Sequence, residues 1–229
     1  MNVMPIYEIK KTSNGVVVVS DCLYHGDCLG DPVEASLRPY DSFEVVVPKG
    51  TTKLKPYAFR GYEKISKITI PDSVTSIGTG AFSGCENLKE VILPKRLQKI
   101  GKEVFFRCTG LTNIVIPDGV TEIGEEAFCR CRSLQTINIP EGVKKIESGA
   151  FDCCDELATI TLPASVRSIN PNFSRRSELK NIIIAEGNKF IEFRDNCLID
   201  KKKKTLICSL RPTSIVIPEG VTKIGKNAF

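Results

Sequence analysis

The chain has 229 residues, of which 41% are apolar and 26% charged, so it can bury a core and lacks the composition of a disordered polypeptide. A formal net charge of +5 is too small to indicate a nucleic-acid partner. No run approaches the ~20 apolar residues of a transmembrane helix, which argues against membrane insertion. The single histidine, His25, excludes mechanisms that need two histidines, such as HExxH proteases.

Residues 1–41 do not follow the repeat described below, and we expect them to form a β-rich N-terminal cap. Residues 16–19 are all valine and follow the turn-forming pair Asn14 and Gly15, which predicts a short buried strand. Repeat stacks need such a cap because an end coil otherwise exposes its apolar edge.

A group of metal-ligand residue types lies inside this cap, at Cys22, His25 and Cys28 with Asp27 beside them. A structural zinc site would need closer cysteine spacing and a fourth ligand. We therefore interpret the group as an ordinary cap loop and predict no metal, no cofactor and no catalytic residue in this segment or elsewhere in the chain.

From residue 42 onward the sequence repeats with a period of 23 residues. The unit reads L-x-x-I-x-I-P-x-x-V-x-x-I-G-x-x-A-F-x-x-C, and its register breaks after Pro163, where Phe173 replaces the Ala–Phe pair. Strand-like alternation resumes at Leu179. Prolines, phenylalanines and cysteines recur at this spacing of 23 residues. They are Pro48, Pro71, Pro94, Pro117, Pro140 and Pro163; Phe59, Phe82, Phe105, Phe128 and Phe151; and Cys85, Cys108, Cys131 and Cys154.

In each unit apolar and polar residues alternate, which is typical of a half-buried strand. The strand should end at the proline, because proline has no N–H to donate to a neighbouring strand. Residues 74–77 predict a second extended stretch. Ile77, Ala81, Phe82 and Cys85 then fall on one face of a short helical segment. The predicted fold class is an α/β, β-rich solenoid over residues 42–229, with one parallel β-sheet face and short helical turns on the opposite wall.

The unit IPDSVTSIGTGAFSGCENLKEVIL, residues 70–93, and its successors resemble the BspA-like leucine-rich repeats. The resemblance covers residues 42–229 and implies a leucine-rich repeat stack, with adhesion or host interaction as the role of exported members. Residues 188–208 resemble an insertion of this family, interpreted as a hairpin with strands near 196–200 and 204–208. We interpret the lysines 201–204 as its solvated turn rather than a polyanion-binding patch.

The oxidation state of the ten cysteines indicates in which cellular compartment the protein works. The repeat cysteines point inward, so we expect buried, reduced thiols; disulfides between neighbouring coils are the alternative for an exported protein. The sequence as given shows no signal peptide, and free thiols favour the cytoplasm. A cell-surface or secreted location is the alternative if a leader has been removed.

The outward residues of the strand row are the candidate ligand-binding face, because solenoids bind through such extended faces. We predict a non-enzymatic interaction module for a protein or a surface glycan. The alternative is a structural scaffold, part of a longer array, with self-association at the end near Phe229. The predicted face comprises Lys67, Thr69, Glu90, Ile92, Asn113, Val115, Thr136, Asn138, Thr159, Thr161, Asn181 and Ile183.

Overall fold

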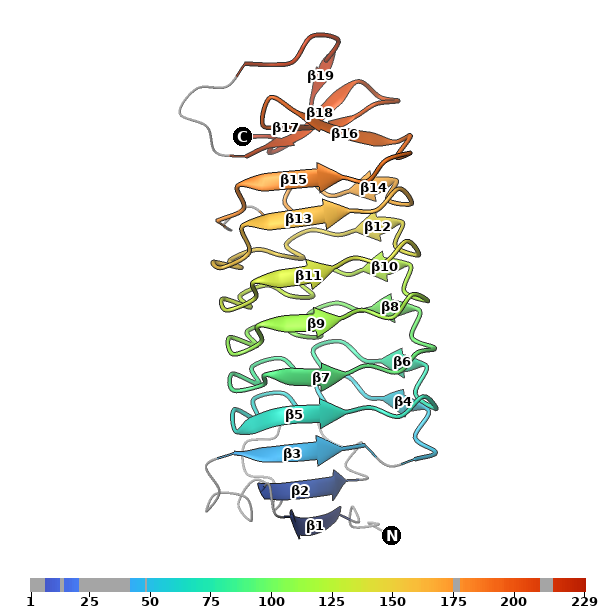
Figure 1. Cartoon of the computed structure of the whole chain (residues 1–229), viewed down its shortest axis with the longest axis vertical. Coiled ribbons are helices and arrows are strands. Elements are labelled where there is room, and N and C mark those ends of the chain that lie inside the picture. The colour runs from blue at the N-terminus through green and yellow to red at the C-terminus, as the bar shows by residue number, and fades with distance from the viewer. Residues whose placement is uncertain (1–6, 13–14, 21–41, 48, 175–177, 211–215) are drawn as a thin grey trace.

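The computed structural model describes residues 7–12, 15–20, 42–47, 49–174, 178–210 and 216–229. The coils stack into an elongated solenoid with one row of parallel strands facing the viewer in Figure 1. Up to β13, each of these front strands ends one or two residues before the proline of its unit, as the sequence predicts, and β15 ends before Ala185 in the proline position. They are β3 (Phe43–Val46), β5 (Ile65–Thr69), β7 (Glu90–Ile92), β9 (Asn113–Val115), β11 (Thr136–Asn138), β13 (Thr159–Leu162) and β15 (Asn181–Ile184).

A second row of two-residue strands runs behind the first (Figure 1). It coincides with the second extended stretch of the repeat, which confirms that part of the prediction. Its members pair in parallel and contribute one buried isoleucine or leucine each. They are β4 (Lys53–Leu54), β6 (Ser76–Ile77), β8 (Lys99–Ile100), β10 (Glu122–Ile123), β12 (Lys145–Ile146) and β14 (Ser168–Ile169).

An antiparallel hairpin extends the front row at the N-terminal side. It consists of β1 (Tyr7–Thr12) and β2 (Gly15–Ser20), and β2 pairs in parallel with β3. The strand predicted at residues 16–19 is therefore present. The candidate metal group at Cys22, His25 and Cys28 lies outside the described residues, and the cap boundary at residue 41 stays a prediction.

The predicted helical turns are wrong: the segments between the back and front strands are chains of tight turns. The backbone N–H groups alternate between two kinds of acceptor. Phe105 donates to the Ala127 carbonyl of the next coil at 2.8 Å, whereas Phe106 donates back to Glu103 at 3.0 Å. Glu103 and Arg107 have φ of 56° and 59°, and such left-handed residues interrupt a right-handed helix. We call this part of each coil the turn wall. Among the described residues no helix is present that could cross a membrane.

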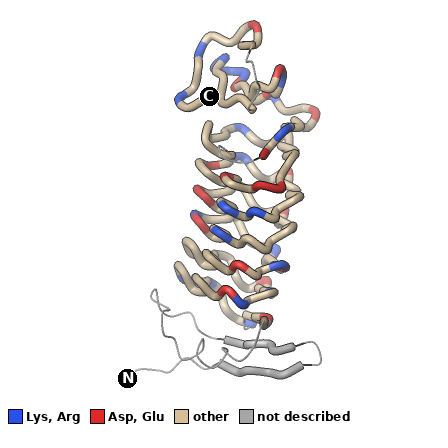
Figure 2. Tube along the Cα trace, turned by 90° about the vertical axis from the view of Figure 1, so that its left-hand side faces the viewer, with Lys and Arg blue, Asp and Glu red and all other residues tan. Residues whose placement is uncertain are grey.

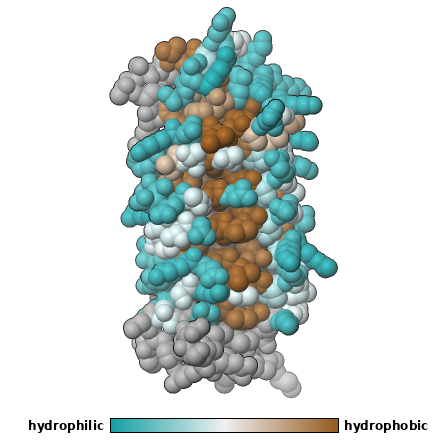
Figure 3. Space-filling view, viewed as in Figure 1, coloured by the Kyte–Doolittle hydropathy of each residue, from teal (hydrophilic) through white to brown (hydrophobic). Residues whose placement is uncertain are grey.

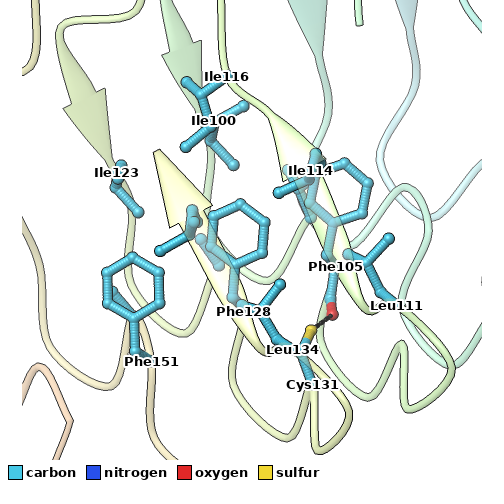
Figure 4. Close-up of a cluster of buried hydrophobic side chains, with 14 of the residues drawn as sticks. Ile100, Phe105, Leu111, Ile114, Ile116, Ile123, Phe128, Cys131, Leu134 and Phe151 are labelled. Atoms are coloured by element: carbon cyan, nitrogen blue, oxygen red, sulfur yellow. Dashed lines mark hydrogen bonds between the residues drawn. The ribbon is translucent and has the colours of Figure 1, made fainter. Parts of the chain in front are cut away.

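The core is a column of phenylalanine rings with a column of thiols beside it. Successive rings from Phe59 to Phe151 stack at centroid distances of 5.4–5.6 Å. The thiol of Cys131 donates to the backbone carbonyl of Phe105 at 3.1 Å, and the other repeat cysteines do the same one coil apart (Figure 4). The repeat cysteines are fully buried free thiols, as predicted.

Both strand rows are interrupted at one level of the stack. The front sheet that contains β7 ends there and the next begins at β9; behind them, β6 and β8 are likewise unpaired with each other. The turn wall continues across this level: Phe82 donates to Val104 at 3.0 Å and Gly84 to Phe106 at 2.7 Å. The stacking of Phe82 on Phe105, at 5.5 Å, is also intact.

The C-terminal part departs from the coil pattern. Strands β16 (Ile191–Arg194), β17 (Cys197–Asp200) and β18 (Thr205–Ser209) form an antiparallel sheet, to which β19 (Lys223–Ile224) adds in parallel. The lysines 201–204 form an exposed turn. The buried amide of Asn188 fixes this sheet to the last regular coil, because it donates to the carbonyls of Pro163 and Val166 and accepts from Phe190 and Ile191.

Candidate binding face

The outward side chains of the front strands form two columns, because the strands pair in register within each sheet, from β5 to β7 and from β9 to β15. Strand pairing places Lys67 beside Glu90, Thr136 beside Asn113, and Thr161 beside Asn138 and Ile183. All of the predicted face residues are exposed or half-buried, so the alternation assigned their direction correctly. The first column comprises Lys67, Glu90, Asn113, Thr136, Thr159 and Asn181, and the second Thr69, Ile92, Val115, Asn138, Thr161 and Ile183.

The second column is unusually apolar for a solvated surface. Val115 is 76% exposed, Ile183 47% and Ile92 44%. In Figure 3, drawn from the same side as Figure 1, a hydrophobic stripe runs along the front strands between hydrophilic flanks. Contiguous exposed apolar area of this kind marks binding surfaces more often than scattered single residues do.

Charge is nearly absent from this face. Its only charged members are Lys67 and Glu90, whose Nζ and Oε1 atoms form an ion pair at 2.9 Å. The hydrogen bond to Glu90 raises the pKa of Lys67. From β9 to β15 both columns consist of asparagine, threonine and aliphatic residues.

The other sides of the coils are charged and internally paired. On the back row Lys99 contacts Glu122 at 2.8 Å, and on the turn wall Lys102 contacts Glu125 at 3.2 Å. The hydrogen bond to Glu125 raises the pKa of Lys102. Figure 2 shows basic and acidic residues interspersed along the coils. Such exposed ion pairs stabilise little and keep the walls hydrated.

A groove of about 760 Å³ opens on the front face where the sheets are interrupted. We call it the β7–β9 groove. It differs from the rest of the face because strands that share a ladder lie only ~4.8 Å apart and leave no space between them. Its lining comprises Lys89, Glu90, Val91, Ile92, Leu93, Lys95, Asn113, Ile114, Val115 and Pro117. Sequence reasoning included Glu90, Ile92, Asn113 and Val115 in the face but missed the flanking residues.

Among the described cysteines, the four repeat thiols and Cys129 do not offer reactive thiolates. Desolvation raises the pKa of Cys131 and of the other repeat thiols, and it raises the pKa of Cys129 to about 12. A nucleophilic cysteine requires the opposite shift. Among the described residues no group of His, Cys, Asp and Glu side chains is arranged to hold a metal ion.

The repeat geometry agrees with a known sequence family. The family model for the BspA type leucine rich repeat region matches residues 41–115 and 98–229, in 6 copies. The chain belongs to this family. Among curated proteins, none is significantly similar in sequence to this chain.

Solved structures of bacterial leucine-rich repeat proteins share the fold. The T. pallidum leucine rich repeat protein TpLRR is 26% identical, with a TM-score of 0.53 over 77% of this chain and 82% of that one. The pneumococcal vaccine antigen PcpA is 21% identical, with a TM-score of 0.72 over the full chain and 61% of that protein. A leucine-rich repeat protein from Eubacterium ventriosum is 22% identical, with a TM-score of 0.56 over 97% of this chain and 54% of that one.

Proposed function

We propose that this BspA-type leucine-rich repeat protein is a non-enzymatic interaction module that binds a protein partner through its front strand face. The observation that supports this most is the contrast between faces. The front columns beyond Glu90 carry no charge and expose Ile92, Val115 and Ile183, whereas the walls carry paired charges. Protein interfaces are depleted in charged residues at their centre, which fits the front face and not the walls.

The strand row also suits binding because each of its two sheets is rigid. Its backbone is held by ladders on most coils, so little conformational entropy is lost when a partner docks. Asparagine and threonine side chains supply hydrogen bonds around the aliphatic residues. A surface glycan is the second ligand class that such amide and hydroxyl groups fit.

The test uses immobilised protein to capture partners from a bacterial or host cell-surface extract, with the captured proteins identified by mass spectrometry and glycans tested on an array. We expect Val115→Glu with Asn138→Glu to abolish capture while leaving the thermal unfolding profile unchanged, since both side chains point to solvent. Arg130→Glu, on the turn wall, is the matched control and should leave capture intact. Unchanged capture by the double variant, with loss in the control, would exclude the front face and place the binding site on the turn wall. The absence of any captured partner would favour a purely structural array.

A further inference from the structure

The β7–β9 groove has a chemical character that the rest of the face lacks. Val115 and Ile92 stand on the two strands that border it, and the buried residues Val91 and Ile114 belong to the same lining. An aliphatic or aromatic side chain of a partner would be desolvated there on several sides. Where neighbouring front strands are paired, the same side chain could contact only the ends of the outward-pointing side chains.

Cationic side chains lie near the two ends of the groove. Lys89 precedes β7 and Lys95 follows it, and both are exposed and line the groove. Six residue steps, which include β7, separate their Cα atoms by at most about 20 Å.

Neither lysine forms an ion pair with a described residue, whereas Glu90 is paired with Lys67 at 2.9 Å. The carboxylate of Asp72 is engaged by the backbone N–H of Lys95, at 2.9 Å, and not by its ammonium group. The groove therefore presents an apolar floor between two positive charges that lack a matching anion among the described side chains.

We propose that the β7–β9 groove is the anchoring site of the front face and takes an extended segment of a protein partner, apolar in its middle and acidic at both ends. The proposal rests on the proposed function and specifies its partner. Complementary charges would fix the position of the segment, and burial of its apolar middle would supply most of the affinity. An extended segment fits because the groove follows the direction of the bordering strands.

The test uses two fluorescein-labelled synthetic peptides, Asp-Thr-Ile-Val-Ile-Thr-Asp and its counterpart with lysine at both ends, titrated against the folded protein by fluorescence anisotropy. We expect the acidic peptide to bind at least about tenfold more tightly, with an advantage that shrinks in high salt. Lys89→Glu with Lys95→Glu should reverse the preference. Val115→Glu should abolish binding of the acidic peptide.

Ile183→Glu is the matched control, because Ile183 occupies the same column and a similar exposure of 47%, on a coil outside the groove. It should leave peptide binding unchanged. Equal affinity for the two peptides, no binding of either up to about 1 mM, or equal loss in the Ile183 variant would overturn the proposal. If the peptides fail while Val115→Glu with Asn138→Glu still abolishes capture of a protein, the groove assignment falls and the front-face function stands.

Discussion

Phe82, Phe105 and Phe128 each stack on the equivalent rings of the coils on both sides, so one repeated residue links successive coils through the core. Phe128 is fully buried, with ring centroids at 5.4 Å on one side and 5.6 Å on the other. A vacated ring position lies between two rigid rings and cannot collapse readily.

We expect Phe128→Ala to lower the free energy of unfolding by ~3–5 kcal/mol in urea melts followed by circular dichroism. Phe106→Ala is the control, because Phe106 is half-buried on the turn wall and outside the ring column; its loss should be clearly smaller. A cost below ~1 kcal/mol for Phe128→Ala would show that the column does not carry the packing.

The buried thiols should make the free energy of unfolding decrease at alkaline pH. Burial raises the pKa of Cys131 above that of an unfolded cysteine, about 8.5. The neutral thiol therefore contributes fully to stability at pH values below the pKa of the unfolded state. This contribution is lost as the pH rises from there toward the pKa of the folded state.

Between about pH 8 and pH 10, one such thiol should remove about 2 kcal/mol from the free energy of unfolding. Urea melts at several pH values should therefore show a flatter decline for Cys131→Ala than for the unmodified protein. Val120→Ala, a fully buried apolar truncation, should lower stability without changing the slope. Parallel slopes for the Cys131 variant and the unmodified protein would contradict the assignment of a raised pKa.

At the scale of elements, the strands and the core column could be predicted from the sequence, whereas the turn wall could not. Alternation determines which side of a short strand is buried, and proline placement determines where the strand ends. The spacing of Ile77, Ala81 and Phe82 fits a helical face and equally fits consecutive turns. The left-handed residues that decide between them are glycine in one coil, at Gly80 and Gly84, but Glu103 and Arg107 in the next, so glycine does not recur at these positions as a sequence signal.

The glycine that recurs after the back strand of successive units, at Gly101 and Gly124, differs between coils in how closely the neighbouring backbone approaches it. A Cβ on Gly124 would lie 2.7 Å from the carbonyl carbon of Gly101, so the residue is small because the preceding coil passes close by. At Gly101 the nearest atom, the Ile77 carbonyl oxygen, would be 3.6 Å away. The difference arises because the back row is interrupted between β6 and β8.

These two glycines therefore provide a matched pair. Gly124→Ala should destabilise the protein by ~1–3 kcal/mol, because backbone must move. Gly101→Ala should be neutral or stabilise by up to ~1 kcal/mol through the unfolded state. Thermal unfolding of the two variants side by side measures the difference, and equal destabilisation would mean that the coils are equally close at both levels.

At the scale of the whole molecule, both strand rows are interrupted between the same two coils. The stack is therefore divided into two parts that the turn wall joins. Each coil of a solenoid contacts only its neighbours, so one weakened step is not compensated by distant contacts. The period of 23 residues is unchanged across this step, from Pro94 to Pro117, which is why neither the interruption nor the groove could be predicted from the sequence. Because the phenylalanine stacking and the turn-wall hydrogen bonds are intact at this level, we expect local opening of the front face to hinge on the turn wall.

Amide hydrogen exchange followed by NMR tests this hinge directly, because local opening exposes amides in proportion to its free energy. The N–H of Gln135 donates to Thr112 at 2.9 Å, and that of Gly124 to Ile100 at 2.8 Å. The equivalent amides one coil earlier, Thr112 and Gly101, find no backbone carbonyl among the described residues. We expect these two to exchange at least about tenfold faster than their counterparts, while Phe82 on the turn wall stays protected. Equal protection at all coils would show a uniformly paired stack and exclude a hinge at this level.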